Sequence, residues 1–381
     1  MTHPVNKIAV VVPKYGLVGG AEHVVSELTE RIALSSEYEI HVFANKWLQL
    51  SDRVKFHKVP VIAFPKFLTT ISFAYFARKK IAEMEFDLIH AHDRIFDADI
   101  FTMHGIPHRI WVEEVRKKRM SLFDYGTAWV ERCLVENRRC KKFIAVSTLT
   151  KEKFLKQYST VDPERVAVIH PGIDTNRIKN LDRLSCRREI MQQFHIESTD
   201  KIILFVSMNF NIKGLDFLIR ALSRLKIRHP SERFKLLVVG KGNEKKYGSM
   251  AEDLGIKDHV IFTGIMPRER LERIYVASDI FSMLSRFDTF GMAALEAMAA
   301  SLPVIISASV GARDLVREGE NGFVVEDAAQ PETVAERIKI MLQNDMRDRM
   351  GHEARITAGK YSWDMAVAET QAVYEEILAG R

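Results

Sequence analysis

Short apolar segments alternate with longer helical patterns along the whole chain, and this alternation restricts the fold more than any other feature. Continuous apolar strands separated by helices are typical of parallel sheets covered by helices on both faces. The predicted strands form two series, first at residues 8–12, 40–44, 88–91, 143–146 and 166–169, then at 202–206, 235–239, 260–263, 280–284, 304–306 and 322–325. The clearest helical patterns between them lie at residues 22–34, 215–225, 269–277 and 331–343. We therefore expect two α/β domains in tandem.

The boundary between the two domains is expected in the turn-rich segment His170–Asp174. The first domain would cover residues 1–172 and the second residues 173–361, with a final helix within 362–381 crossing back onto the first domain. A chain of 381 residues is long enough for two complete cores. In open α/β sheets, ligands bind beyond the carboxyl ends of the strands. The loops that follow the strands are therefore where chemistry is expected.

Composition narrows the environment and the partners. The formal net charge is +6, a modest excess that favours anionic partners. Cys133, Cys140 and Cys186 show neither disulfide nor metal spacing, which is typical of the reducing cytosol. No apolar run approaches the roughly 20 residues of a membrane span, and residues 1–7 are polar rather than arranged as a signal peptide. We expect a cytoplasmic protein.

The segment Ser285–Glu296 carries the strongest functional signal. Asp288 and Glu296 stand on either side of Phe290 and Gly291, the first acid in a loop after a strand and the second on a helix expected at residues 292–300. A glycine at a helix start leaves backbone N–H groups and the positive end of the helix dipole open to a phosphate. Carboxylates accept hydrogen bonds from hydroxyls. Phosphate and hydroxyls together describe a sugar nucleotide; the plain alternative is a helix entry whose acids are favoured by the dipole.

Two other segments that follow predicted strands could contact phosphate. Gly16, Gly19 and Gly20 follow the first strand and open a helix, so the backbone there can turn tightly and approach a ligand closely. Their spacing is not that of the dinucleotide fingerprint, and an ordinary strand–helix turn is the alternative. Lys213-Gly214 follows the first strand of the second series, where the lysine could reach a diphosphate as a point charge.

Further turns follow other strands. Gly240 and Gly242, like Gly264 further on, could lie near a nucleotide base or could simply form turns. His104-Gly105 stands in a loop where a histidine could face a sugar hydroxyl or a developing charge. A capped loop histidine is its alternative.

Two groups of residues raise the question of a metal. His90-Ala91-His92 ends the third predicted strand, but a zinc site needs three or four ligands and no matching set is evident. Asp97-Ala98-Asp99 resembles an acidic triplet that holds a metal-bound diphosphate in another transferase fold, a short pattern that arises easily by chance. We therefore expect no metal.

The region 106–142 is rich in arginine and lysine, with aromatic residues interleaved. Its densest basic run is 116–119, and the segment 64–80 could extend it. Such a stretch indicates contact with a membrane surface or an anionic acceptor, although a solvated helix face would explain it equally. Basic and aromatic residues also suit nucleic acid, but no helix-turn-helix, zinc-knuckle or ribonucleoprotein motif is present. No nucleic-acid partner is expected.

Together these segments resemble the retaining glycosyltransferases of family 4, which have the GT-B fold, over nearly the whole chain. The likeness rests on segments in the family's order: the glycine loop 16–20, the break 170–174, Lys213-Gly214, the strand and turn at 260–264, and the acid–Phe-Gly–Glu segment at 288–296. It implies two Rossmann-like domains facing a central cleft, the first on the acceptor side and the second binding a nucleoside-diphosphate sugar such as UDP-glucose.

The resemblance also implies roles for residues of the second domain. Asp288 would contact hydroxyls of the donor sugar, and Glu296 would hold the ribose. Lys213 and the amides of Phe290 and Gly291 would stabilise the leaving diphosphate without a metal. Members of the family commonly carry glutamate where this chain has Asp288, which affects the choice of sugar. Many also carry an arginine a few residues before the lysine, and residues 207–212 contain none.

In the first domain, the resemblance implies that Gly19 and Gly20 let the backbone meet the phosphate and that His104 lies beside the donor sugar. A narrower likeness, to enzymes that add a hexose to the inner core of lipopolysaccharide, rests on Phe210 with Lys213-Gly214 and on the basic region after His104. It implies an anionic glycolipid acceptor at the cytoplasmic face of the inner membrane. Two alternatives stay open: a sugar-nucleotide 2-epimerase of the same fold, and a basic membrane-associated protein without enzymatic activity.

Overall fold

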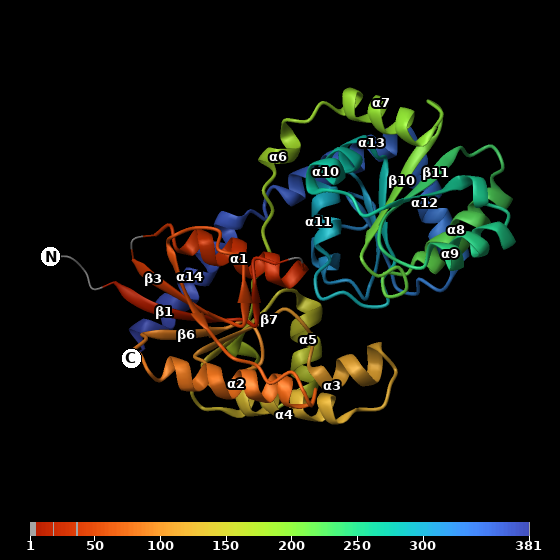
Figure 1. Cartoon of the computed structure of the whole chain (residues 1–381). Coiled ribbons are helices and arrows are strands. Elements are labelled where there is room, and N and C mark those ends of the chain that lie inside the picture. Colours follow the sequence, from red (N-terminus) through yellow and green to blue (C-terminus); the bar gives the residue numbers. More distant parts are fainter. Residues whose placement is uncertain (1–4, 18, 36, 381) are drawn as a thin grey trace. The chain divides into compact units, whose positions relative to one another are not determined.

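The computed structural model describes residues 5–17, 19–35 and 37–380. Part of the polar N-terminal stretch (residues 1–4), Val18 of the glycine loop, Ser36 and Arg381 at the end of the predicted last helix lie outside the described residues. The chain divides into two compact units (Figure 1). Unit 1 comprises Met1–Gly172 and Trp363–Arg381, and unit 2 comprises Ile173–Ser362.

Unit 1 is built on a seven-stranded sheet in which all pairings are parallel. The strand order is β5-β3-β1-β6-β7-β8-β9, so the direction of winding reverses between β1 and β6. The strands are β1 (Asn6–Val11), β3 (Tyr38–Ala44), β5 (Val54–Lys58), β6 (Leu88–Ala91), β7 (Ile100–Met103), β8 (Lys142–Ala145) and β9 (Val166–Val168). Two short strands, β2 (Lys14–Tyr15) and β4 (Lys46–Trp47), form a separate parallel pair.

Helices cover both faces of this sheet. One face holds a core of apolar side chains from the strands and from α2 (Leu68–Ile81), α4 (Leu122–Glu136) and α5 (Thr148–Gln157). On the other face α1 (Gly20–Ile32) packs against α14 (Trp363–Ala379), the last helix of the chain (Figure 1). The remaining helical segments of unit 1 are short: α3 (His108–Ile110), a π-helical turn at Trp111–Val115 and a 3-10 turn at Pro163–Arg165.

Unit 2 is built on a six-stranded sheet, again with parallel pairings only. The strand order is β12-β11-β10-β13-β14-β15, and the reversal lies between β10 and β13. The strands are β10 (Lys201–Ser207), β11 (Phe234–Gly240), β12 (Val260–Gly264), β13 (Ile280–Met283), β14 (Val304–Ser307) and β15 (Gly322–Val325).

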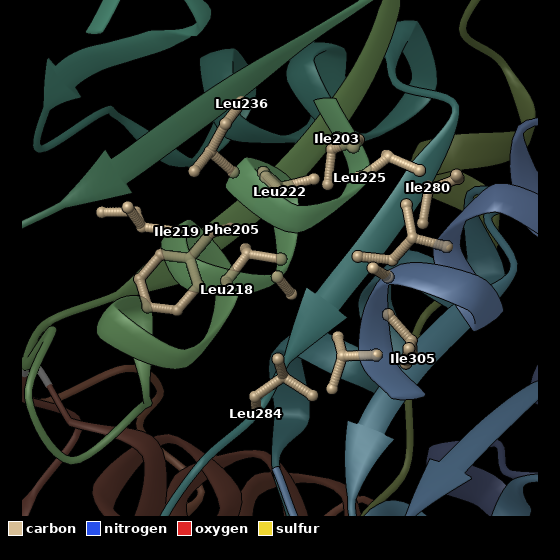
Figure 2. Packing of buried hydrophobic residues seen from close by; sticks show 14 of the residues in the cluster. Ile203, Phe205, Leu218, Ile219, Leu222, Leu225, Leu236, Ile280, Leu284 and Ile305 are labelled. Carbon is tan, nitrogen blue, oxygen red and sulfur yellow. The ribbon is translucent and has the colours of Figure 1, made fainter. Parts of the chain in front are cut away.

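The main core of unit 2 lies on one face of this sheet. Ile203, Phe205 and Leu236 project from the strands toward α8, whose Leu218, Ile219, Leu222 and Leu225 are fully buried (Figure 2). Ile305 of β14 belongs to the same cluster. Helices α8, α9 and α12 cover this face, and α10 and α11 cover the other (Figure 1). The helices of unit 2 are α6 (Asn176–Lys179), α7 (Arg183–Phe194), α8 (Leu215–Arg228), α9 (Glu244–Asp253), α10 (Arg268–Ala277), α11 (Met292–Ala299), α12 (Pro331–Leu342) and α13 (Asn344–Ala358), with 3-10 turns at Lys257–His259 and Gly311–Leu315.

The predicted fold class, two Rossmann-like units with parallel sheets, is confirmed. The prediction missed two strands of the seven-stranded sheet, β5 and β7, as well as the separate short pair β2 and β4. In β5 (VKFHK), two lysines and a histidine interrupt the apolar run, because the strand lies at the edge of the sheet. The fully buried β7 has only four residues, and short apolar runs are ambiguous in sequence. Within the described residues, no helix is long and apolar enough to span a membrane.

The last helix is fastened to the sheet of unit 1 by a buried hydrogen bond. The Tyr374 hydroxyl lies 2.7 Å from His90 Nδ1, and His90 Nε2 lies 2.7 Å from Thr102 Oγ1. Tyr374→Phe would leave a ring nitrogen of the buried His90 without this partner. We expect a loss of about 1–3 kcal/mol in the free energy of unfolding of unit 1. Tryptophan fluorescence during urea unfolding reports on unit 1, because it contains all four tryptophans: Trp47, Trp111, Trp129 and Trp363.

The matched control is Tyr75→Phe on α2, because Tyr75 is 57% exposed. We expect this change to leave the urea midpoint where it is in the unsubstituted protein. If Tyr374→Phe shifts the midpoint no more than Tyr75→Phe does, the bond to His90 does not stabilise unit 1.

Candidate active site

The point where the winding reverses brings two loops of unit 2 together. β10 lies between β11 and β13, so the loop after β10 (208–214) and the loop after β13 (284–291) leave the sheet side by side. In open α/β sheets a ligand crevice is expected at such a point, because the two loops lead to opposite faces of the sheet. The place between loops 208–214 and 284–291 is called the crevice of unit 2. The strongest motif of the sequence and Lys213 are therefore neighbours in space.

Lys213 is held by a compact turn. Its backbone N–H donates to the Asn209 carbonyl at 3.1 Å, and Gly214 follows with a φ of 73°. A Cβ atom at Gly214 would lie 1.9 Å from the Leu284 carbonyl oxygen, so only glycine fits here. The Lys213 ammonium forms an ion pair with Asp288 Oδ2. Both side chains are partly buried, at 23% and 16% exposed. The pair thus joins the two loops at the crevice.

Asp288 is fixed from both sides. Its N–H donates to the Ser309 carbonyl at 2.9 Å, and its carbonyl accepts from the Gly311 N–H at 3.0 Å. Its second carboxylate oxygen, Oδ1, lies 3.4 Å from the backbone N–H of Phe290, a contact at the long limit of a hydrogen bond. The carboxylate therefore sits between an ammonium group and the chain that leads into α11, where it could accept hydrogen bonds from hydroxyls.

The start of α11 has the conformation expected of an anion-binding turn. Gly291 has a φ of 92°, and a Cβ atom there would lie 2.8 Å from Val310 Cγ1. The ring of Phe290 is buried in the protein, so this residue would offer a ligand its backbone rather than its side chain. The N–H groups of the first turn of a helix lack partners from earlier helical residues. A helix start of this kind beside an ammonium group is suited to an anion.

Glu296 lies one turn further along α11. Its Oε2 accepts a hydrogen bond of 2.9 Å from the hydroxyl of Tyr275, a buried residue of α10. Burial raises the pKa of Glu296, and the bond from Tyr275 and the charge of Arg268 only partly oppose that effect. The Glu296 carboxylate is thus held in place by Tyr275 although burial removes it from water. Ionisable groups with such shifted pKa values are typical of binding and catalytic sites.

The glycines after β11 have a packing explanation. A Cβ atom at Gly240 would lie 1.8 Å from the Ser207 carbonyl oxygen, and one at Gly242 would overlap the ring of Phe210 at 2.1 Å. Both glycines therefore allow the loops after β10 and β11 to pack closely. Gly264 has a φ of 71° with no atom within 4 Å of a Cβ position, so its conformation alone favours glycine.

Unit 1 has an open pocket at its own point of reversal, between β1 and β6. The pocket has a volume of about 360 Å³ and is lined by residues after β1, β6 and β7, including Lys14, Glu22, Asp93 and His104. Gly16 turns the preceding chain with a φ of 66°. Gly19 stands directly before α1, in extended backbone, and Gly20 is its first residue. These are the predicted residues of unit 1, and they gather at the carboxyl ends of the strands.

Three histidines of unit 1 are kept neutral by burial. His104 Nε2 lies 2.9 Å from His92 Nδ1, and the rings of His90 and His92 are 4.0 Å apart. Burial lowers the pKa of His90 to about 3 and that of His104 to about 4, and it lowers the pKa of His92 well below its usual value. At neutral pH, His104 is therefore an uncharged donor or acceptor, which suits a hydroxyl group.

The Asp97-Ala98-Asp99 triplet is at the opposite end of the sheet. These residues directly precede β7, where the strand begins. Asp97 pairs with Arg78 at 2.8 Å, and Asp99 Oδ2 accepts from the Ile89 N–H at 2.8 Å. Both acids thus fasten segments of unit 1. Within residues 5–17, 19–35 and 37–380, no three histidine, cysteine or acidic side chains are grouped as metal ligands.

Sequence reasoning missed two groups at the crevice. Arg286, two residues before Asp288, donates from Nη1 and Nη2 of its guanidinium group to the two carboxylate oxygens of Asp216, at 2.9 and 2.7 Å. The place of Arg286 inside the motif could have marked it as a candidate site residue. Nothing in the sequence indicates that its partner lies 70 residues away. Tyr275, the partner of Glu296, lies in an ordinary amphipathic helix and gave no signal.

Comparison with known proteins agrees with this fold. The family model described as Glycosyltransferase Family 4 matches residues 18–177, and the model described as Glycosyl transferases group 1 matches residues 187–357. The chain belongs to the family 4 glycosyltransferases of GT-B fold.

Among curated relatives, a D-inositol 3-phosphate glycosyltransferase of Corynebacterium glutamicum is 31% identical over 258 residues, which is 65% of this chain and 60% of that protein. An uncharacterized glycosyltransferase of Methanocaldococcus jannaschii is 27% identical over 97% of this chain and 98% of its own length. The chain thus spans only about 60% of the first of these relatives.

Two solved structures illustrate the shared fold. WaaG, a glycosyltransferase involved in lipopolysaccharide biosynthesis, superposes with a TM-score of 0.79 at 21% identity, covering 96% of this chain and 99% of its own. Anabaena HepE, solved in complex with UDP-glucose, superposes with a TM-score of 0.69 at 17% identity, covering 97% and 99%. At these identities the likeness concerns the fold.

The raised pKa of Glu296 generates a prediction about stability. A carboxyl group with a raised pKa in the folded state binds its proton more tightly there, so the stability of unit 2 should fall as pH rises from the unfolded-state pKa through the folded-state pKa. Glu296→Gln removes this titration and keeps an oxygen for Tyr275. In the absence of ligand, we expect the variant to be more stable than the unsubstituted protein at pH 7, with the difference shrinking toward pH 4. Calorimetric scans across this pH range measure it; a variant that is less stable at pH 7 would contradict the expectation.

Proposed function

We propose that this protein transfers a hexose from a nucleoside-diphosphate sugar, such as UDP-glucose, to a hydroxyl group of an acceptor. The observation that carries the proposal is the crevice of unit 2, where the Lys213 ammonium, the Asp288 carboxylate and the start of α11 meet at the reversal point of the sheet. A cation with helix-start amides suits a diphosphate, and a carboxylate suits sugar hydroxyls.

In this proposal, each group of unit 2 has one task. Lys213 and the amides at Phe290 and Gly291 stabilise the charge that develops on the leaving diphosphate, which is electrostatic preorganisation. Asp288 accepts hydrogen bonds from hydroxyls of the transferred sugar. Glu296, held by Tyr275, accepts hydrogen bonds from the ribose. Because Lys213 supplies the positive charge, we propose that transfer needs no metal ion.

Unit 1 would contribute uncharged groups. We propose that His104 hydrogen-bonds to the transferred sugar and that the backbone at Gly19 and Gly20 approaches a phosphate. The support is the position of His104 in the pocket of unit 1, the lowered pKa of His104, and the place of Gly19 and Gly20 at the start of α1. We propose retention of the anomeric configuration through attack on the face that the leaving group vacates. The leaving phosphate oxygen would then take the proton of the acceptor hydroxyl.

A glycolipid such as a lipopolysaccharide core, or a related cell-surface glycan, is the proposed acceptor. Support comes from an exposed surface on α4, where Leu122, Tyr125 and Trp129 recur at spacings of three and four residues and are 74%, 62% and 51% exposed. This stripe lies on the helix face opposite the core. α2 packs closely alongside, at Gly126, and the exposed Phe64 lies just before it.

Basic residues accompany this apolar stripe. The run 116–119 lies just before α4, and all four of its residues are exposed. Aromatic side chains together with lysine and arginine favour the interface of an anionic membrane. We propose that unit 1 rests on the cytoplasmic face of the inner membrane through region 106–142, close to a lipid-borne acceptor.

A ligand screen tests the proposed function. Sugar nucleotides with UDP, GDP and ADP are added separately, and thermal unfolding is recorded, because a ligand that binds the folded state stabilises it. The stabilising donor is then incubated with the protein, with and without a glycan acceptor. Transfer that requires acceptor supports the proposal. Conversion of the donor alone to its 2-epimer would instead identify an epimerase, and vesicle binding without any sugar-nucleotide binding would indicate a non-enzymatic membrane protein.

The proposed role of Lys213 predicts a large loss of activity. Lys213→Ala should lower kcat by about a hundredfold or more, since removal of one key oxyanion donor typically has that effect. Initial rates of transfer from the donor identified in the screen measure it. Lys257→Ala is the matched control, because Lys257 also pairs with a carboxylate, Glu252 at 2.8 Å, but precedes β12 at the opposite end of the sheet. Near-normal turnover in the Lys213 variant would contradict the role.

The membrane proposal predicts weaker vesicle binding when the stripe is made polar. Tyr125→Ser combined with Trp129→Ser should reduce binding to vesicles of phosphatidylglycerol and phosphatidylcholine by about tenfold or more, since two large apolar contacts are lost. Co-sedimentation at low and high salt measures it. Leu184→Ser, at a 71% exposed position of unit 2, is the control. Equal binding of both variants would exclude α4 as the contact surface.

A further inference from the structure

Arg286 links the two loops of the crevice through its side chain. Its guanidinium group binds both carboxylate oxygens of Asp216, in the first turn of α8, and Nη1 also donates to the Asn211 carbonyl at 2.5 Å. The guanidinium carbon lies 4.3 Å from the centre of the Phe217 ring. One side chain from the loop after β13 therefore engages both the loop after β10 and the helix that follows it.

Backbone contacts extend this link on both sides of Lys213. The Arg286 N–H donates to the Ile212 carbonyl at 2.8 Å, so the residue before Lys213 is fastened to the loop after β13. The residue after it, Gly214, lies against the Leu284 carbonyl oxygen, with no room for a Cβ atom between them. Lys213 is thus held between two contacts made by residues 284–286.

The contacts of the Arg286 guanidinium group decide its role. A bidentate pair with Asp216 and a bond to the Asn211 carbonyl direct the group to α8 and to the loop after β10. We therefore assign Arg286 to holding these two elements rather than to replacing the arginine absent from 207–212. A lysine side chain is a flexible point charge that loses rotamer freedom when it binds a ligand. If its backbone is already fixed, less conformational entropy is lost on binding.

We propose that Arg286, oriented by Asp216, is a positioning residue that fixes the Lys213 loop for diphosphate binding. Because Arg286 and Asp288 lie on the same short segment, the same contacts set the spacing between Lys213 and Asp288. The effect on ligand binding rests on the proposed function of Lys213; the effect on the loop itself does not. The experiment separates the two.

The first part measures the loop in the ligand-free protein. Arg286→Met keeps an unbranched apolar side chain beside Phe217 and removes every guanidinium donor. Hydrogen exchange of the segment 208–214 should become about tenfold faster, since local opening no longer breaks a charge-assisted bond. The double variant Arg286→Met with Asp216→Asn should show the same faster exchange, and it leaves no unpaired carboxylate at position 216. Exchange as slow as in the unsubstituted protein, in both variants, would overturn the proposal.

The matched control for this measurement is Arg337→Met. Arg337 also lies over a phenylalanine, Phe323 at 4.6 Å, and also binds a carboxylate, that of Glu318 at 3.0 Å. Because Arg337 belongs to α12 and its partners lie at or before the start of β15, loss of its side chain should leave exchange in 208–214 unchanged. Faster exchange in this control as well would show a general loosening of unit 2 and would count against a specific role for Arg286.

The second part measures affinity for UDP, GDP and ADP by calorimetry in four proteins: unsubstituted, Arg286→Met, Lys213→Ala and the double variant. If Arg286 acts through Lys213, its substitution should weaken the tightest-binding nucleotide by about tenfold in the presence of Lys213 and hardly at all in its absence. Equal losses in both backgrounds would overturn positioning through Lys213. If Lys213→Ala leaves nucleotide affinity unchanged while Arg286→Met still speeds exchange of the loop, the proposed function of Lys213 is wrong. The role of Arg286 in fixing the loop is then still supported.

Discussion

The ion pair between Lys213 and Asp288 is the contact on which the candidate active site depends. It joins loops that are 75 residues apart in sequence, and it does so where the sheet of unit 2 reverses its winding. Two opposite charges in a partly buried crevice hold each other in place until a ligand with both anionic and hydroxyl groups can engage each of them. Gly214 makes this approach possible, because a Cβ atom there would collide with the Leu284 carbonyl of the facing loop. A Cβ atom at Gly291 would instead collide with Val310.

The two units prepare their polar groups differently. In unit 2, charged side chains are matched in pairs, Lys213 with Asp288 and Arg286 with Asp216. In unit 1, burial keeps the histidines around His104 neutral, and their ring nitrogens bond to one another, to Thr102 and to Tyr374. Charged groups suit a diphosphate, and a neutral histidine such as His104 suits a hydroxyl group. This difference is what the transfer of a sugar from a diphosphate to a hydroxyl would require.

Much of the fold could be predicted from sequence, because buried parallel strands appear in it as continuous apolar runs. The edge strand β5 breaks this rule and was missed. The short strand β7 was missed too, and with it the position of the Asp97–Asp99 triplet directly before a strand. For the site, the loop positions of Lys213 and Asp288 followed from the strand pattern. Their pairing did not, because strand order decides which loops are neighbours. The partners Asp216 and Tyr275 were beyond prediction for the same reason, since each meets its site residue only through packing of α8 or α10.

The most direct test of the account is a crystal structure of the protein with the nucleoside diphosphate that it binds most tightly. The account predicts phosphate oxygens within hydrogen-bond distance, about 2.7–3.2 Å, of Lys213 Nζ and of the backbone N–H groups that follow Gly291, with the ribose at Glu296. A diphosphate bound at the glycine turn of unit 1 instead, with the pair between Lys213 and Asp288 undisturbed, would contradict it.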